Sequence, residues 1–122
     1  MTSKRILIAD DSNTARGVLG KFFAQRDFDV CETVDGEDTI QKAWELKPDL
    51  ILLDVAMPHT NGIAAASVLK DILPNVRIVL FTMYTEAIAR AFPDGEFAAD
   101  AVISKGDGLG KLEECVRSLL RS

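Results

Sequence analysis

Short apolar runs alternate along the chain with longer stretches in which apolar residues recur every three or four positions. This order repeats five times, which is the pattern of strand–helix units around a parallel sheet. The runs Leu50–Leu53 and 78–81 contain no alternating polar residues, as is typical of central strands that helices cover on both faces. The strands are therefore predicted at residues 5–9, 29–34, 50–53, 76–81 and 101–104.

The stretches between the strands carry residues that begin and end helices. Ser12 or Asn13 offers a side-chain oxygen to cap a first helix over about residues 13–26. Asp35 can cap a second helix, which Pro48 ends by forcing Lys47 out of helical geometry. Asn61 and Thr85 can start the next two helices, which end near Pro74 and at Pro93-Asp94-Gly95, and a last helix runs through 109–120.

Each helix has an apolar stripe that we expect to face the core. The predicted inward residues are Ala15, Val18, Leu19, Phe22 and Phe23, then Ile40, Ala43 and Trp44, then Ala65, Val68, Leu69 and Ile72, and finally Leu109, Leu112, Val116, Leu119 and Leu120.

Composition favours one globular domain over residues 1–122, because 48% of the residues are hydrophobic and 27% are charged. The first apolar run is only four residues long, so we expect neither a signal peptide nor a membrane span. We therefore expect the protein to be cytoplasmic. A net charge of −5 argues against a nucleic-acid-binding surface. Cys31 and Cys115 lack metal or redox spacing and are interpreted as reduced packing residues.

Polar residues stand at the end of four of the five predicted strands. Asp10 and Asp11 follow the first, Asp54 the third, Thr82 the fourth and Lys105 the fifth. In an open parallel α/β sheet, ligands bind at the carboxyl ends of the strands, so we expect these five side chains to lie together. The sequence therefore predicts a functional site at this edge.

Three carboxylates in a partly dry crevice repel one another unless some are protonated or a cation neutralises them. Oxygen ligands favour Mg²⁺, which is held in proteins by one or two carboxylates together with phosphate oxygens. Lys105 would add a fixed positive charge, and Thr82 a hydroxyl donor for a phosphoryl oxygen. These residues predict a phosphoryl-transfer site that acts through electrostatics and positioning.

The same residues resemble the conserved set of the two-component response regulator receiver domain, and the likeness covers nearly the whole chain. It rests on Asp10-Asp11, on Asp54 in Leu-Leu-Asp-Val-Ala-Met-Pro-His-Thr-Asn-Gly, on Thr82 and on Lys105. The resemblance implies a flavodoxin-like doubly wound (βα)₅ fold with a five-stranded parallel sheet in the order 2-1-3-4-5.

The resemblance also implies a role for each residue. Asp54 would accept the phosphoryl group, and Mg²⁺ would be held by Asp10, Asp11, Asp54 and the backbone carbonyl of Ala56. Lys105 would pair with the acyl-phosphate oxygens, and Thr82 would sense them.

The implied donor is a phosphohistidine on a sensor histidine kinase or a phosphotransfer protein. The implied output is a downstream protein partner, an output domain outside this sequence or a phosphorylation-dependent homodimer. Such a domain is a signalling switch that catalyses only its own phosphorylation and dephosphorylation.

Two positions depart from the family pattern, and both concern signalling. Val102 stands three residues before Lys105, where many receivers carry Tyr or Phe, and Gly106 follows Lys105 where the family often has Pro. Met83 is larger than the residue common at its position, and Tyr84 occupies a position that tunes water attack in the family.

Two other functions remain open from the sequence. A phosphorylation-independent interaction module on the same fold would be consistent with Val102 and Gly106. A dehalogenase-like phosphatase would need Asp-x-Asp after its first strand, where this chain has Asp10-Asp11. The only histidine, His59, is predicted to be an exposed turn residue, and residues 105–110 are predicted to form a flexible loop.

Overall fold

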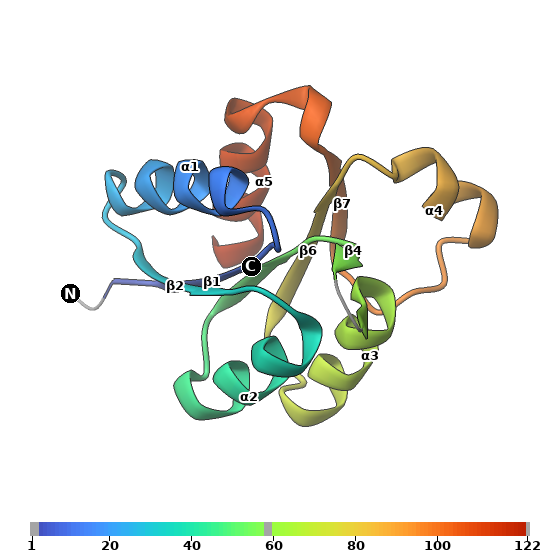
Figure 1. The fold of residues 1–122 in the computed structure, drawn as a ribbon, viewed down its shortest axis with the longest axis horizontal. Coiled ribbons are helices and arrows are strands. Elements are labelled where there is room, and N and C mark those ends of the chain that lie inside the picture. The colour runs from blue at the N-terminus through green and yellow to red at the C-terminus, as the bar shows by residue number, and fades with distance from the viewer. Residues whose placement is uncertain (1–2, 58–59, 122) are drawn as a thin grey trace.

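The computed structural model describes residues 3–57 and 60–121. The main sheet consists of β1 (Arg5–Ala9), β2 (Asp29–Thr33), β3 (Leu50–Leu53), β6 (Arg77–Thr82) and β7 (Ala101–Ser104). All neighbouring strands pair in parallel, in the order β2-β1-β3-β6-β7 (Figure 1). Counted over these five strands, the order is the expected 2-1-3-4-5, which confirms the doubly wound α/β prediction.

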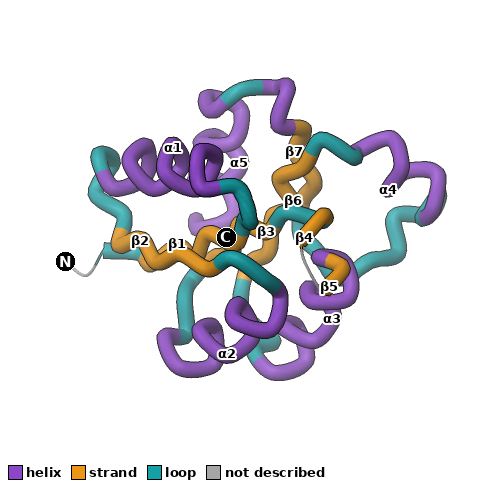
Figure 2. The backbone as a smooth tube through the Cα atoms, viewed as in Figure 1, coloured by secondary structure: helices purple, strands orange, loops and turns teal. Residues whose placement is uncertain are grey.

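Helices follow the strands and cover both faces of the sheet, as the single layer of strands in Figure 2 shows. They are α1 (Asn13–Ala24), α2 (Gly36–Leu46), α3 (Gly62–Ile72), α4 (Thr85–Ala91) and α5 (Leu109–Arg121). Ser12 caps α1, Asp35 caps α2 and Asn61 caps α3, each by accepting a backbone N–H of the first turn. Lys47 ends α2 in a left-handed conformation, at φ 48°, directly before Pro48.

The core has two halves because successive strand residues point to opposite faces of the sheet. Leu7 and Ala9 of β1 belong to the half that packs against α2, α3 and α4. Ile6 and Ile8 of the same strand belong to the half that packs against α1 and α5. None of the helices in residues 3–57 and 60–121 has the length and apolar run needed to cross a bilayer.

Several apolar residues predicted to face the core are exposed instead. Trp44 is 57% exposed, Val18 49% and Val68 42%. Each lies at the border of its helix stripe, so its neighbour in sequence takes the buried position: Ala43, Leu19 and Leu69 are at most 3% exposed. The Trp44 ring is covered on one side by the Lys47 ammonium, 4.1 Å from its centroid.

Some predicted boundaries were wrong by one or two residues. The first helix ends at Ala24, before the left-handed residue Asp27. The second strand ends at Thr33, and the fourth spans Arg77–Thr82, so Thr82 is the last residue of a strand.

Three short elements were not predicted. Residues 105–110, expected to form a flexible loop, contain the 3₁₀ turn η1 (Lys105–Asp107) and the start of α5. β4 (Ala56–Met57) and β5 (Thr60–Asn61) form an antiparallel pair after β3. The prediction for His59 lies outside the described residues.

Candidate functional site

The polar residues predicted to form a site do stand at one edge of the sheet. Asp10 follows β1, Asp54 follows β3, Thr82 ends β6 and Lys105 follows β7. β1 and β3 are hydrogen-bonded neighbours, and the Asp54 N–H donates to the Ala9 carbonyl at 3.0 Å. The sheet register therefore places Asp54 beside Asp10, although they are far apart in sequence.

Three carboxylates meet at this edge. Asp10, Asp11 and Asp54 each offer an oxygen, and these oxygens lie within 4.8 Å of one another. Asp10 is 2% exposed and Asp54 8%, whereas Asp11 is exposed. Two of the acids are therefore buried and the third is exposed, and we call this group of three carboxylates with Lys105 the acidic pocket.

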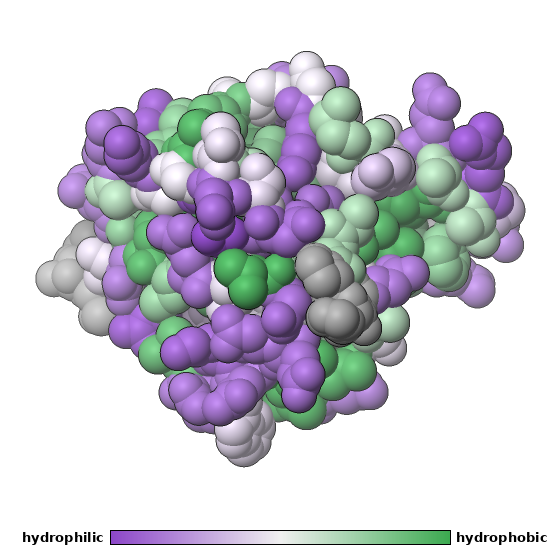
Figure 3. All heavy atoms as spheres, in the orientation of Figure 1, coloured by the Kyte–Doolittle hydropathy of each residue, from purple (hydrophilic) through white to green (hydrophobic). Residues whose placement is uncertain are grey.

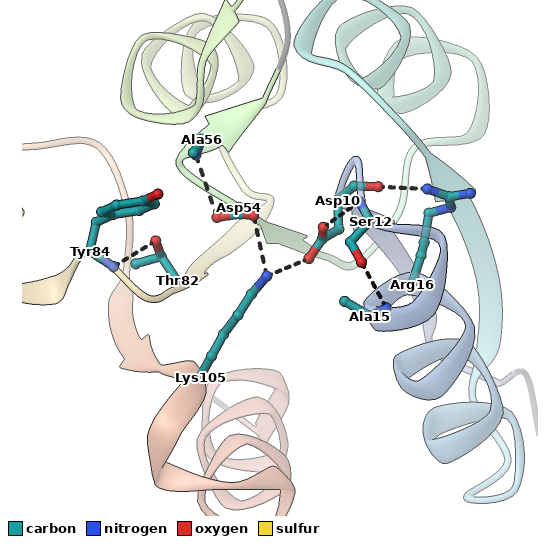
Figure 4. A network of polar contacts seen from close by, with 9 residues as sticks. All are labelled: Asp10, Ser12, Ala15, Arg16, Asp54, Ala56, Thr82, Tyr84 and Lys105. Atoms are coloured by element: carbon teal, nitrogen blue, oxygen red, sulfur yellow. Dashed lines mark hydrogen bonds and ion pairs between the residues drawn. The ribbon is translucent and has the colours of Figure 1, made fainter.

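Lys105 joins the two buried acids (Figure 4). Its Nζ atom donates to Asp10 Oδ2 at 2.7 Å and to Asp54 Oδ2 at 3.2 Å. Burial lowers the pKa of Lys105, but the hydrogen bond to Asp10 and the charges of both acids more than offset this, so the net pKa is raised. Lys105 therefore remains charged at neutral pH.

The donor set fits a hard divalent cation. Among the described residues, three carboxylates and one ammonium give this cluster a net formal charge of −2. Because the unbalanced groups are carboxylate oxygens, a dication of the Mg²⁺ class matches both their charge and their chemistry.

The backbone around Asp54 is held by a close approach of α3. The Gly62 N–H donates to the Val55 carbonyl at 2.9 Å, and a Cβ built on Gly62 would collide with the Asp54 carbonyl oxygen. Ala56 donates its N–H to Asp54 Oδ1 in a long contact of 3.4 Å. Glycine at position 62 is therefore needed for the Asp54–Val55 backbone to pass close to the start of α3.

Thr82 is completely buried, and its hydroxyl oxygen accepts the backbone N–H of Tyr84 at 3.1 Å. That hydroxyl retains its own proton for donation. Met83 and Tyr84 are 68% and 53% exposed, at the start of the segment that leads into α4. Thr82 thus links the edge of the sheet to the entrance of α4.

Val102 and Gly106, the two residues that differ from the family pattern, have structural contacts outside the acidic pocket. Val102 lies half-buried on β7 and packs against the core half that includes α4. The Gly106 N–H donates to Ser104 Oγ at 3.1 Å and closes the first turn of η1. Neither residue contacts the acidic pocket through a hydrogen bond or ion pair within the described part of the chain.

Sequence reasoning missed one residue at this edge, Arg16. It extends from the first turn of α1, and its Nη1 donates to the Asp10 carbonyl at 2.8 Å. Ser12 was expected only as a helix cap, but its backbone N–H also donates to Asp10 Oδ1 at 2.9 Å. In the sequence Arg16 is simply an arginine five residues after Asp11, and nothing in that spacing signals the contact.

Comparison with known proteins identifies the family to which this fold belongs. The model of the response regulator receiver domain family matches residues 6–117. The response regulator protein VraR of Staphylococcus saprophyticus is 37% identical over 93% of this chain. A protein-glutamate methylesterase/protein-glutamine glutaminase of Maricaulis maris is 40% identical over 95% of it. The chain spans 54% of the length of the first relative and 30% of the second.

Solved structures give the same result. The response regulator domain of Thermotoga maritima CheB has a TM-score of 0.84 and 30% identity, covering 99% of this chain and 98% of that one. The response regulator TrrA of Thermotoga maritima, solved in complex with Mg²⁺ and BeF, has a TM-score of 0.86 and 28% identity, covering 95% of this chain and 98% of that one. The chain therefore belongs to the response regulator receiver domain family of two-component systems.

Proposed function

We propose that Asp54 is the phosphoacceptor of this receiver domain and that the pocket around it works with Mg²⁺. The observation that carries the proposal is the position of Lys105, whose ammonium bridges Asp10 and Asp54 in a largely buried pocket. Asp10, Asp11 and Asp54, with the Ala56 carbonyl, would hold the ion. Bound Mg²⁺ would offset the charge of the incoming phosphoryl group. The Mg²⁺ and BeF bound to the relative TrrA are consistent with this assignment.

The chain's own residues then have defined tasks in the transfer. An Asp54 carboxylate oxygen attacks the phosphorus of a phosphohistidine, an O–P bond forms, and the P–N bond breaks with its electron pair returning to the imidazole. Lys105 is close enough to Asp54 to accompany the phosphoryl oxygens as charge builds on them. Water attack on the same phosphorus later releases inorganic phosphate and restores the carboxylate.

The donor in this proposal is a sensor histidine kinase or a phosphotransfer protein in the cytoplasm, and the whole chain, residues 1–122, acts as one receiver domain. The output passes to a downstream protein, to an output domain or to a second copy of the chain. An output domain is included because the relatives are longer than the part of them that this chain matches. The domain would turn over its own phosphate and no separate substrate.

The direct test treats the purified chain with a small acyl phosphate or phosphoramidate donor and Mg²⁺, and measures intact mass. We expect one added phosphoryl group in the parent and none in Asp54→Asn, because Asn is nearly isosteric but cannot form an acyl phosphate. Asp71→Asn, which changes an exposed aspartate on α3, is the matched control and should be phosphorylated like the parent. Equal modification of Asp54→Asn and the parent would move the acceptor elsewhere.

A phosphorylation-independent interaction module is the second candidate function. Val102 and Gly106 favour it, because both replace residues that the family uses to transmit the signal. A parent chain that takes up no phosphate and does not bind Mg²⁺ would support this second candidate.

A further inference from the structure

Arg16 is a second cationic side chain beside the acidic pocket, after Lys105. Its guanidinium donates to the Asp10 carbonyl at 2.8 Å and to Asn13 Oδ1 at 2.6 Å, and it pairs with Glu32 Oε1 at 3.3 Å. Its side chain is only 15% exposed. Figure 4 shows it reaching from α1 to the backbone of Asp10, on the side away from Lys105.

These contacts complete the fixation of Asp10. The Asp10 N–H donates to the Thr33 carbonyl at 3.2 Å, and the two carboxylate oxygens accept from the Ser12 N–H and from Lys105. The Asp10 carbonyl is the remaining polar group, and Arg16 binds it. Every polar group of Asp10 therefore has a partner.

Asp11 gains its orientation from the same contact. Within the described residues no hydrogen bond or ion pair holds the exposed Asp11 carboxylate. The peptide bond between Asp10 and Asp11 is planar, so fixing the Asp10 carbonyl also fixes the direction in which Asp11 leaves. Arg16 thus helps to fix the backbone direction from which the Asp11 carboxylate extends.

The positive charge of Arg16 is balanced by a residue other than Asp10. Glu32 on β2 neutralises it, and a Cβ on Gly20 of α1 would lie 3.1 Å from Glu32 Oε2, so the absence of a side chain there gives Glu32 room. A neutralised guanidinium can bind the Asp10 carbonyl without repelling a cation in the pocket. The three contacts use three different nitrogens of the planar guanidinium, whereas lysine carries all its donors on one nitrogen.

We infer that Arg16 is a positioning residue that preorganises Asp10 and Asp11 for cation binding. The inference rests on the proposed function, because it assumes that the pocket binds Mg²⁺. Removing Arg16 should leave all three carboxylates present but make the Asp10–Asp11 peptide more mobile. Part of the free energy of Mg²⁺ binding would then be used to order this peptide. Groups that orient metal ligands in this way typically change affinity by about 10–100-fold.

The test measures the Mg²⁺ dissociation constant by titration calorimetry, together with the free energy of unfolding in the absence of Mg²⁺. Arg16→Met should raise the dissociation constant by about tenfold. It should also speed amide exchange at Asp11 and Ser12, which a loss of general stability would not do selectively. Arg77→Met is the matched control, since Arg77 pairs with Asp100 at the opposite edge of the sheet, and it should bind Mg²⁺ like the parent.

The outcomes separate this inference from the proposed function. If the parent binds Mg²⁺ and Arg16→Met binds it equally well, this inference alone is overturned. If the parent does not bind Mg²⁺, the proposed function is overturned and this inference with it. Should Arg16→Met fail to fold, Arg16→Lys keeps the charge with a single donor group, and an unchanged dissociation constant in that variant would equally overturn the role of the guanidinium.

Discussion

The Lys105 ammonium lies 3.2 Å from Asp54 Oδ2, across a pocket in which Asp54 is only 8% exposed. The same ammonium is 2.7 Å from Asp10 Oδ2, so one cation compensates two buried carboxylates. These ion pairs contribute to stability only while both the ammonium and the carboxylates are present, because a buried charge without a partner is costly. The pocket is therefore a place where stability, cation binding and phosphoryl chemistry depend on the same residues.

Removing Lys105 should make the stability of the protein strongly dependent on Mg²⁺. Without Mg²⁺, Lys105→Met should lower the free energy of unfolding by about 2–4 kcal/mol, since two buried carboxylates lose their partner. With Mg²⁺ the loss should be much smaller. Urea unfolding with and without the ion measures both values. Lys111→Met, which breaks an exposed ion pair with Asp107, should cost less than about 1 kcal/mol in either condition. An equal loss with and without Mg²⁺ would contradict this prediction.

Mg²⁺ should also stabilise the parent chain. Binding to the native state alone adds about 2.7 kcal/mol at about a hundredfold excess over Kd. Asp11→Ala should remove most of that gain and change stability little in the absence of the ion, because Asp11 is exposed. Thermal unfolding scans at increasing Mg²⁺ concentration provide the measurement, with Asp71→Ala as the exposed control. A parent melting temperature that does not respond to Mg²⁺ would count against the site.

A second ion cluster, away from the site, should control acid stability. Asp100 accepts the Ile78 N–H at 2.8 Å and pairs with Lys70 at 2.8 Å and with Arg77 at 3.6 Å. Burial raises the pKa of Asp100, but the hydrogen bonds from Lys70 and Ile78 and the nearby charges outweigh it, so the net pKa lies below its ordinary value of 3.8.

The sign of the pH effect follows from that lowered pKa. The contribution of Asp100 is fully present above the ordinary pKa of 3.8 and is lost as the pH falls through the lower folded value. Asp100→Asn should therefore lose about 1–2 kcal/mol near neutral pH, and the gap to the parent should close in strong acid. Denaturant unfolding over a pH series tests this, and a gap that stays constant down to the acid limit would contradict it.

Much of the fold and the site was predictable because their signals are local in sequence. β3 is a continuous apolar run, and polar residues directly follow or end the strands whose carboxyl ends form the site. The pair β4–β5 was missed because strands of two residues have no detectable period. Trp44 was placed wrongly because the buried stripe of α2 is narrower than its apolar pattern.

The role of Arg16 was invisible for a different reason. An arginine on the first turn of a helix looks like a solvated residue, and only the direction of α1 relative to β1 brings it to the Asp10 carbonyl. That direction is a property of the packed sheet and helices, which no spacing in the sequence encodes. The same holds for Gly62. The structure shows that α3 lies so close to the Asp54 backbone that no side chain fits at position 62, and the sequence alone does not show this contact.

Phosphorylation of Asp54 should reach the protein surface through Thr82. A phosphoryl group on Asp54 should accept the free hydroxyl proton of Thr82, and a charge-assisted hydrogen bond of this kind is stronger than the one from the Tyr84 N–H. Movement of Thr82 toward the phosphate would weaken that backbone contact and alter the entrance of α4. Within the described residues of α4 only Ile88 is buried, so the helix has little to hold it in place.

Hydrophobic surface is exposed in Figure 3 on the side of the molecule where Figure 1 places α4. An open groove of about 570 Å³ beside α4 is lined among others by Tyr84, Ala87 and Phe92. Val102 is stiff at χ1 and too small to act as a moving aromatic, so we expect Tyr84, which is 53% exposed, to change its position instead. Phosphorylation should thus be reported by the segment that joins Thr82 to α4 and by α4 itself.

Thr82→Ala should still accept phosphate on Asp54 but should uncouple that event from residues 83–92. Amide hydrogen exchange in this segment, measured before and after phosphorylation, should change in the parent and stay constant in the variant. Thr82→Ser is the matched control, because it keeps the hydroxyl while removing only a methyl group, and it should restore the response. If exchange in residues 83–92 responds equally in the parent and in Thr82→Ala, the signal does not pass through this hydroxyl, and the β7 and α5 side of the domain would have to carry it.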